Sequence, residues 1–171
     1  QNKSIELATE MINSFEKKYE EKWLNMMRKK LGLFHIENKD KYLILDLLTW
    51  MHQKGVDYTN TFCHLMDFKI DNDKNFNDDD FQSWKKRWKE RLKINNNTSE
   101  KHINLMKSVN PLVIPRNHKV EEVLSEANKS NMEPFKKLLN ILKNPYSEQS
   151  DIKEYQIPST KNEKYQTFCG T

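Results

Sequence analysis

The clearest hydrophobic pattern in the chain runs through its first 31 residues. Apolar side chains recur there at intervals of three and four, which places them on one face of a long helix. The members of this face are Ile5, Ala8, Ile12, Phe15, Tyr19, Trp23, Met26 and Leu31. Ser4 is the expected N-cap and Gly32 the expected stop. We expect Phe15 and Trp23 to be buried in the core.

Two shorter helices and a loop are predicted next. A helix from Asp40, its expected cap, to Lys54 ends at Gly55, and Asp57 caps a short helix after it. The buried face of the first of these is predicted to consist of Leu43, Leu47, Leu48 and Met51. The segment 67–80 is acidic, rich in Asn and without a pattern, which predicts an exposed loop.

The helix predicted over 78–93 combines aromatic and basic residues. Aspartates stand at its start and basic residues at its end, which suits the helix dipole. One face carries Phe81, Trp84, Trp88 and Leu92. Such a pattern fits either a basic, aromatic patch for nucleic acid or a buried aromatic stripe below a solvated basic face. The second interpretation requires fewer assumptions and is preferred.

Three further helical segments complete the pattern. Thr98 or Ser99 caps a helix that ends near Val109, where Asn110-Pro111 interrupts it. A helix after Pro115 is expected to turn Val120, Val123, Leu124 and Ala127 inward. The last helix, 132–142, has Pro134 in its first turn and is expected to pack through Phe135, Leu138, Leu139 and Leu142.

The periodic signal stops at Asn144, and no strand-like alternation is sustained anywhere in the chain. We therefore predict an all-α fold: an irregular bundle of about seven helices over residues 1–143, followed by an extended C-terminal tail over 144–171. The aromatic content of 11% supports a folded domain despite a mean hydropathy of -0.97.

Composition excludes several classes of function. Three glycines, Gly32, Gly55 and Gly170, cannot supply a phosphate-binding loop, so no catalytic or cofactor-binding residue is assigned. The net charge of +4 comes from interspersed charges of both signs, which argues against a nucleic-acid partner. No apolar run is long enough to span a membrane. Two cysteines are too few for a secreted disulfide framework, so a cytoplasmic location is expected.

The histidines and cysteines suggest no metal site. No HExxH pair occurs, and the adjacent Cys63 and His64 point in different directions on a helix, so no metal ligand is assigned. Cys169 lies third from the end, where an accessible thiol could reach another cysteine. An inert terminal cysteine explains the same residue, and both interpretations stay open.

Five segments, in order, resemble the YdiU/SelO (selenoprotein O) family. They are KYEEKWLNMMRKKLGL, VDYTNTFCHL, NPLVIPRNHKVEEVLSEA, FKKLLNILKNPY and YQTFCGT. Asn110, Pro111, Arg116, Asn117 and His118 form their most distinctive part. The resemblance covers nearly the whole chain and corresponds to the C-terminal portion of the family.

The resemblance implies a function for the intact protein. Members of the family have a protein-kinase-like fold that transfers AMP from ATP, with Mg or Mn, to Ser, Thr or Tyr hydroxyls of other proteins. Their ATP-binding, metal-binding and catalytic residues lie in an N-terminal core that has no counterpart in this chain. We therefore expect this chain alone to be no enzyme and to support or regulate that core, which would be its partner together with the protein substrates of the parent.

The resemblance also gives roles to particular residues. Cys169 occupies the place where relatives carry selenocysteine or cysteine, which implies a redox function with a cysteine of the missing core. For the distinctive motif, contact with the core is one interpretation. A structural role is the other, with Asn117 capping a helix and Arg116 pairing with an acidic side chain.

Two questions remain open at this stage. A stand-alone helical protein-interaction module without catalysis is the alternative function, and a homodimer through a face normally covered by the core is also conceivable. The richness in Asn and Lys favours a bacterial source, and a eukaryotic one would point to mitochondria.

Overall fold

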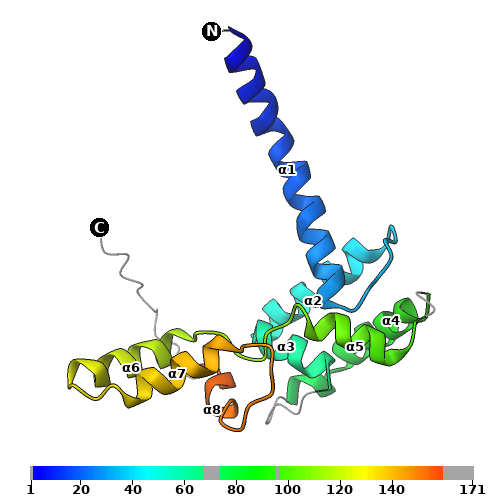
Figure 1. Ribbon diagram of the computed structural model, residues 1–171. Coiled ribbons are helices and arrows are strands. Elements are labelled where there is room, and N and C mark those ends of the chain that lie inside the picture. Colours follow the sequence, from blue (N-terminus) through cyan, green and yellow to red (C-terminus); the bar gives the residue numbers. More distant parts are fainter. Residues whose placement is uncertain (1, 68–73, 95–96, 160–171) are drawn as a thin grey trace. The chain divides into compact units, whose positions relative to one another are not determined.

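The computed structural model describes residues 2–67, 74–94 and 97–159, and within these ranges all regular structure is helical (Figure 1). The elements are α1 (Asn2–Lys30), α2 (Asp40–Lys54), α3 (Tyr58–Leu65), the 3-10 helix η1 (Lys74–Asn77), α4 (Asp79–Ile94), α5 (Ser99–Lys107), α6 (Asn117–Asn128), α7 (Glu133–Lys143) and α8 (Lys153–Gln156). The prediction of an irregular all-α bundle is confirmed.

The chain forms two compact units, Gln1–Pro111 and Leu112–Thr171. The first contains α1 to α5 with η1, and the second contains α6 to α8. The division at residue 143 that the sequence predicts is of another kind, because it separates the part of the chain with helical periodicity from the part without it. That division stays a prediction.

The aromatic face of α4 forms the centre of the first unit. Phe81, Trp84 and Trp88 are at most 4% exposed, so the buried-stripe interpretation of this helix is confirmed. The indole N–H of Trp84 donates to the carbonyl oxygen of Leu43 at 2.8 Å, and that of Trp88 donates to Leu31 at 2.9 Å. The stripe thus holds α4 against α2 and the end of α1 by both apolar burial and hydrogen bonds.

The local signals for helix ends were mostly correct. Gly32 and Gly55 adopt φ of +73° and +63°, the left-handed conformation expected after a helix. The side chains of Asp57 and Thr98 accept hydrogen bonds from the backbone N–H groups of Asn60 and Lys101. The expected cap at Ser4 is wrong, because α1 begins at Asn2.

The predicted burial of α1 is wrong over its first two thirds. Phe15 is 67% exposed and Ile12 is 74% exposed, while Trp23 is half-buried. Only the last turns enter the core, through Met27 and Leu31. The periodicity identified the apolar face correctly, but no described residue covers its first part.

The segment predicted as a featureless loop contains η1. Phe76 of this short helix is buried, and its ring stacks on His64 with centroids 3.8 Å apart. It also contacts Trp50 and Phe81. A single buried aromatic in a polar stretch gives no periodic signal, which is why the pattern did not indicate it.

In the second unit α6 and α7 pack together through Val123, Leu138 and Ile141. Leu124 and Leu139 were expected to point inward, but each is 44% exposed. The region after Asn144 is not uniformly extended, because α8 lies there with Ile152 and Tyr155 buried. Four residues are too few to produce a periodic pattern.

Candidate functional site

The junction at Asn110 and Pro111 is the first half of the distinctive motif. Asn110 is 1% exposed and holds Lys30 twice: its Oδ1 accepts from Lys30 Nζ at 3.0 Å, and its Nδ2 donates to the Lys30 carbonyl at 2.9 Å. The carbonyl oxygen of Pro111 accepts from the buried Cys63 thiol, with Sγ at 3.6 Å. These contacts tie the end of α1, α3 and the chain after α5 together.

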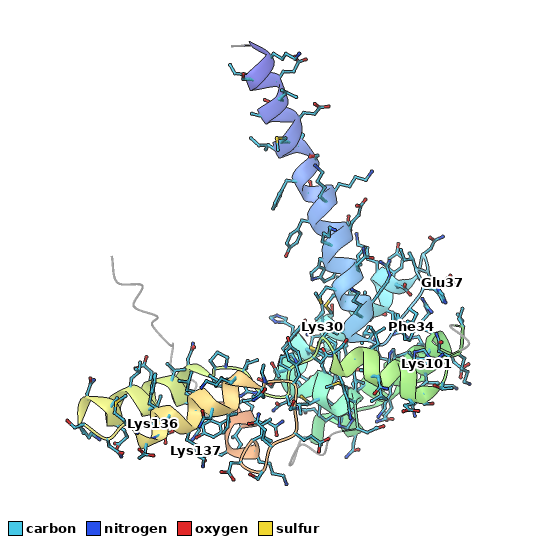
Figure 2. The ribbon with its side chains drawn as sticks, in the orientation of Figure 1. Lys30, Phe34, Glu37, Lys101, Lys136 and Lys137 are labelled. Carbon is cyan, nitrogen blue, oxygen red and sulfur yellow. The ribbon has the colours of Figure 1, made fainter. Side chains whose placement is uncertain are left out.

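Lys30 lies in an unusual place for a cation. Its ammonium group stands over the rings of Phe62 and Tyr58, 4.8 Å and 5.4 Å from the centroids. Burial lowers the pKa of Lys30, although a coulombic interaction with Cys63 acts in the opposite direction. The aromatic faces and the Asn110 oxygen replace the water that the ammonium loses. Figure 2 marks Lys30 at the base of α1.

Arg116, Asn117 and His118 belong to the second unit. Arg116 Nε donates to the carbonyl oxygen of Tyr155 at 3.2 Å, which connects the start of α6 to α8. The expected cap at Asn117 is wrong: Asn117 is the first residue of α6, and Arg116 holds the N-cap position without a side-chain cap hydrogen bond. Burial lowers the pKa of His118, and the neighbouring Lys119 and Arg116 lower it further.

The motif therefore consists of two groups with separate local partners. Asn110 and Pro111 meet Lys30 and Cys63 in the first unit, whereas Arg116 meets α8 in the second. Hydrogen bonds to backbone and buried side chains give both groups a structural role in this chain. Contact with the kinase-like core that the resemblance implies stays a prediction.

A buried ion-pair centre at Asp40 was not foreseen. The Asp40 carboxylate is 0% exposed. It accepts hydrogen bonds from Arg91 Nε and Arg28 Nε, each at 2.7 Å, and from the backbone N–H of Glu37 at 2.9 Å. The expected capping role is thus replaced by a link between α1, α2 and α4. No sequence pattern indicated it, because Arg91 lies 51 positions away.

Opposing effects set the pKa of Asp40. Burial on its own raises it, but the hydrogen bonds from Arg91, the Glu37 amide and Arg28 act in the other direction. The net pKa is below the usual value of an aspartate. The carboxylate is therefore held in its charged form and serves as a structural anion.

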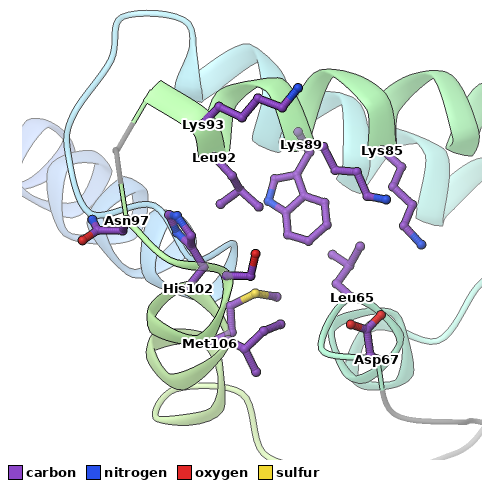
Figure 3. A pocket seen from close by; sticks show the side chains of 12 residues that line it. Leu65, Asp67, Lys85, Lys89, Leu92, Lys93, Asn97, His102 and Met106 are labelled. Atoms are coloured by element: carbon purple, nitrogen blue, oxygen red, sulfur yellow. The ribbon is translucent and has the colours of Figure 1, made fainter.

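A groove of about 360 Å³ between α4 and α5 carries basic side chains on its rim (Figure 3). Lys85, Lys89 and Lys93 project from α4, at steps of four residues. Leu65, Leu92, Ile103 and Met106 supply apolar lining. Burial lowers the pKa of Lys85, and the charge of Lys89 adds to the effect. A groove of this kind suits an acidic, partly apolar ligand.

His102 lines the same groove and is 4% exposed. Its Nδ1 lies 2.7 Å from the carbonyl oxygen of Gly32. Because a carbonyl only accepts, Nδ1 carries the proton, and the imidazole is fixed against the end of α1. The sequence did not single out His102, since a lone histidine on a helix is usually part of the core.

Metal-binding clusters of three or more His, Cys, Asp or Glu side chains do not occur within the ranges that the structure describes. Cys169 lies outside those ranges, so its predicted redox role is untested. No helix in the described part of the chain combines the length and apolar character needed to cross a bilayer.

Comparison with known proteins places these features in a family. The profile of the family described as "Protein adenylyltransferase SelO" matches residues 3–143. Proteins called "Protein nucleotidyltransferase YdiU" are similar over the whole chain: that of Pelagibacter ubique is 50% identical over 172 residues, and that of Alcanivorax borkumensis is 45% identical over 170. That of Clostridium perfringens is 42% identical over 171 residues.

The protein is thus an all-α relative of nucleotidyltransferases. More particularly, the chain belongs to the SelO/YdiU family. The match covers 98–100% of this chain but only 35–36% of each of these three relatives, so the chain spans about a third of their length.

Proposed function

We propose that this chain is the helical C-terminal part of a SelO/YdiU-type protein adenylyltransferase. The supporting observation is the asymmetric match: all of this chain, but 36% of the Pelagibacter nucleotidyltransferase, is aligned. In the proposed reaction a Ser, Thr or Tyr hydroxyl of a protein attacks the α-phosphorus of ATP. The hydroxyl loses its proton and pyrophosphate leaves, so that AMP remains on the substrate.

In this proposal a kinase-like core, N-terminal to the present sequence, binds ATP with Mg or Mn, which would neutralise phosphate charge. The helical part supports or regulates that core. Within the motif of Asn110, Pro111, Arg116, Asn117 and His118, two residues keep the surface that meets the core in shape. Asn110 contacts Lys30, and Arg116 contacts Tyr155.

Labelled ATP with Mg or Mn tests this proposal directly. We expect the intact protein to transfer labelled AMP to protein hydroxyls, and the 171-residue chain alone to transfer none. Chelation of the metal is the control and should abolish the labelling. Transfer by the isolated chain, or retention of label from the γ-phosphate instead of the α-phosphate, would refute the proposal.

Cys169 is proposed to form a reversible disulfide with a cysteine of the core. The bond forms by exchange with an oxidised thiol compound such as glutathione disulfide, which is reduced to two thiols as the two protein thiols are oxidised. Thiol trapping of the intact protein should detect a redox-dependent crosslink that is absent from Cys169→Ser. An identical trapping pattern for both proteins would end this idea.

A stand-alone helical interaction module is the second candidate function. The groove with Lys85, Lys89 and Lys93 favours it, because an apolar floor with a basic rim suits an acidic peptide. A stable complex of the isolated chain with such a peptide, combined with no AMP transfer by the intact protein, would establish this function in place of the first.

A further inference from the structure

The first part of α1 presents an apolar surface that the described chain leaves open. We call it the α1 stripe; its members are Ile5, Ala8, Ile12, Phe15 and Tyr19. Ile5, Phe15 and Tyr19 are 62%, 67% and 61% exposed, respectively. Large apolar side chains are normally scattered singly on a surface, whereas a continuous run marks a contact with another surface.

The C-terminal part of the same helix is packed, in contrast to the part that carries the α1 stripe. From Glu20, which pairs with Lys41, α1 lies against α2, and Met27 and Leu31 are 2% and 0% exposed. Figure 1 shows the remaining turns of α1 continuing beyond these contacts. In proteins most of the stability of an amphipathic helix comes from the packing of its apolar face, and the described residues provide no such packing for the first turns of α1.

The charges of this segment do not determine the partner. Lys3, Lys17 and Lys18 are balanced by Glu6, Glu10 and Glu16. A surface of this kind binds through apolar burial, so we expect its contact to be insensitive to salt.

A second copy of the chain fits the stripe poorly. The spacing of three and four resembles a heptad repeat, but the seam position that follows Tyr19 in such a repeat is occupied by Lys22. Phe15 and Tyr19 are also bulky for a two-stranded seam. In a parallel coiled coil built on this stripe, the positions that flank the seam would pair Met11 with Glu16 of the second copy and Lys18 with Trp23 of the second copy. Neither pair is complementary, whereas coiled coils usually place opposite charges there.

We propose that the α1 stripe docks into an apolar groove formed by the part of the SelO/YdiU protein that lies beyond the matched third. About two thirds of the Pelagibacter relative has no counterpart in this chain, since the alignment covers 36% of it. This proposal rests on the proposed function, because it takes the chain to be one part of a larger enzyme.

Ile12 and Leu7 provide a matched pair for the test. Both are aliphatic and exposed, at 74% and 53%, but Leu7 lies about 140° around the helix from Ile12 and outside the stripe. A photocrosslinking amino acid, p-benzoylphenylalanine, replaces either residue in the intact protein. After irradiation, mass spectrometry identifies the peptides to which each position is joined.

From position 12 we expect crosslinks within the same molecule to peptides outside the 171 residues, and from position 7 at least about tenfold fewer. Crosslinks from position 12 that join two molecules, or that stay within these 171 residues, would overturn the proposal. So would equal yields from both positions.

Stability measurements supply a second readout. In the intact protein Ile12→Asp should lower Tm by at least about 4 °C and Leu7→Asp should not, since only the first charge would be buried. In the isolated chain neither substitution should change Tm, because both side chains are exposed there. AMP transfer by the intact protein without the expected crosslink would refute the docking alone; the crosslink without AMP transfer would refute the proposed function alone.

Discussion

At the scale of single residues, the first unit depends on a few polar side chains that are almost completely buried. Asp40 and Asn110 are 0% and 1% exposed, and each joins segments far apart in the sequence. Buried polar groups are costly unless their hydrogen bonds are made, so the removal of one partner leaves another unsatisfied. This asymmetry makes both positions sensitive to small changes.

Asp40→Asn should destabilise the protein by about 3–5 kcal/mol, because it leaves the buried Arg91 without its counter-charge. Chemical denaturation followed by circular dichroism measures the loss. Asp46→Asn is the control: it removes the exposed pair with Arg87, where both side chains are about half exposed, and should cost at most about 1 kcal/mol. Equal losses for the two variants would contradict the role assigned to Asp40.

The same carboxylate predicts a pH dependence. The folded pKa of Asp40 is lowered, so its contribution is present above the unfolded pKa of about 3.9 and is lost as the pH falls through the folded pKa. Wild-type stability should therefore decrease below about pH 4, and more steeply than that of Asp40→Asn. Parallel pH profiles of unfolding free energy would show that Asp40 is not the group responsible.

Asn110→Ala should lower the free energy of unfolding by about 1–3 kcal/mol, because it removes the hydrogen-bond partner of both the Lys30 ammonium and the Lys30 carbonyl. Asn117→Ala, in the same motif, should change stability by no more than about 0.5 kcal/mol, because Asn117 is exposed and does not cap α6. Urea denaturation of the two variants tests the difference. A reversed order would show that the two halves of the motif have been assigned the wrong roles.

At the scale of elements, local signals were read correctly more often than distant ones. Asp57 and Thr98 could be predicted as caps because their partners lie three residues away. Asp40 could not, because its partner Arg91 is brought close only by folding. The aromatic face of α4 was predicted with its burial, but for α1 the face was correct and the burial was not. Periodicity shows which side of a helix is apolar and leaves open what covers it.

Gly32 and Gly55 offer a test of one helix end against another. Both have a left-handed backbone, so alanine at either should cost about 1–2 kcal/mol. An added Cβ at Gly32 would also lie 3.1 Å from the His102 carbonyl oxygen, whereas Gly55 has open space around it. Thermal unfolding should therefore show a larger loss for Gly32→Ala than for Gly55→Ala. Equal losses would mean that α5 yields to the added methyl.

At the scale of the whole molecule, the chain forms two compact units, and Phe81, Trp84, Trp88 and Met106 are among the buried residues of the first. The site residues named from the sequence are distributed over both units, which the linear motif 110–118 did not reveal. The groove between α4 and α5 escaped prediction for a similar reason: its lining comes from α4, α5 and the end of α3, which are brought together only by folding.

Residues 1–111 expressed alone should unfold in a single cooperative transition, because Phe81, Trp84, Trp88 and Met106 all lie within this unit. A shorter piece, 1–94, lacks α5 and exposes the faces that Met106 and His102 cover, so it should lose this cooperativity. Near-ultraviolet circular dichroism during thermal unfolding distinguishes the two. Loss of cooperativity in both pieces would show that the first unit needs the second.

The indole hydrogen bonds of α4 have a consequence for how this sequence can diverge. Trp84 and Trp88 donate to main-chain oxygens of Leu43 and Leu31, and every amino acid provides such an oxygen. Substitutions at positions 31 and 43 are therefore restricted only by the volume and apolar character of the side chain, because the hydrogen-bond acceptor is a main-chain oxygen that any residue supplies. We expect homologues to vary more freely at those two positions than at 84 and 88.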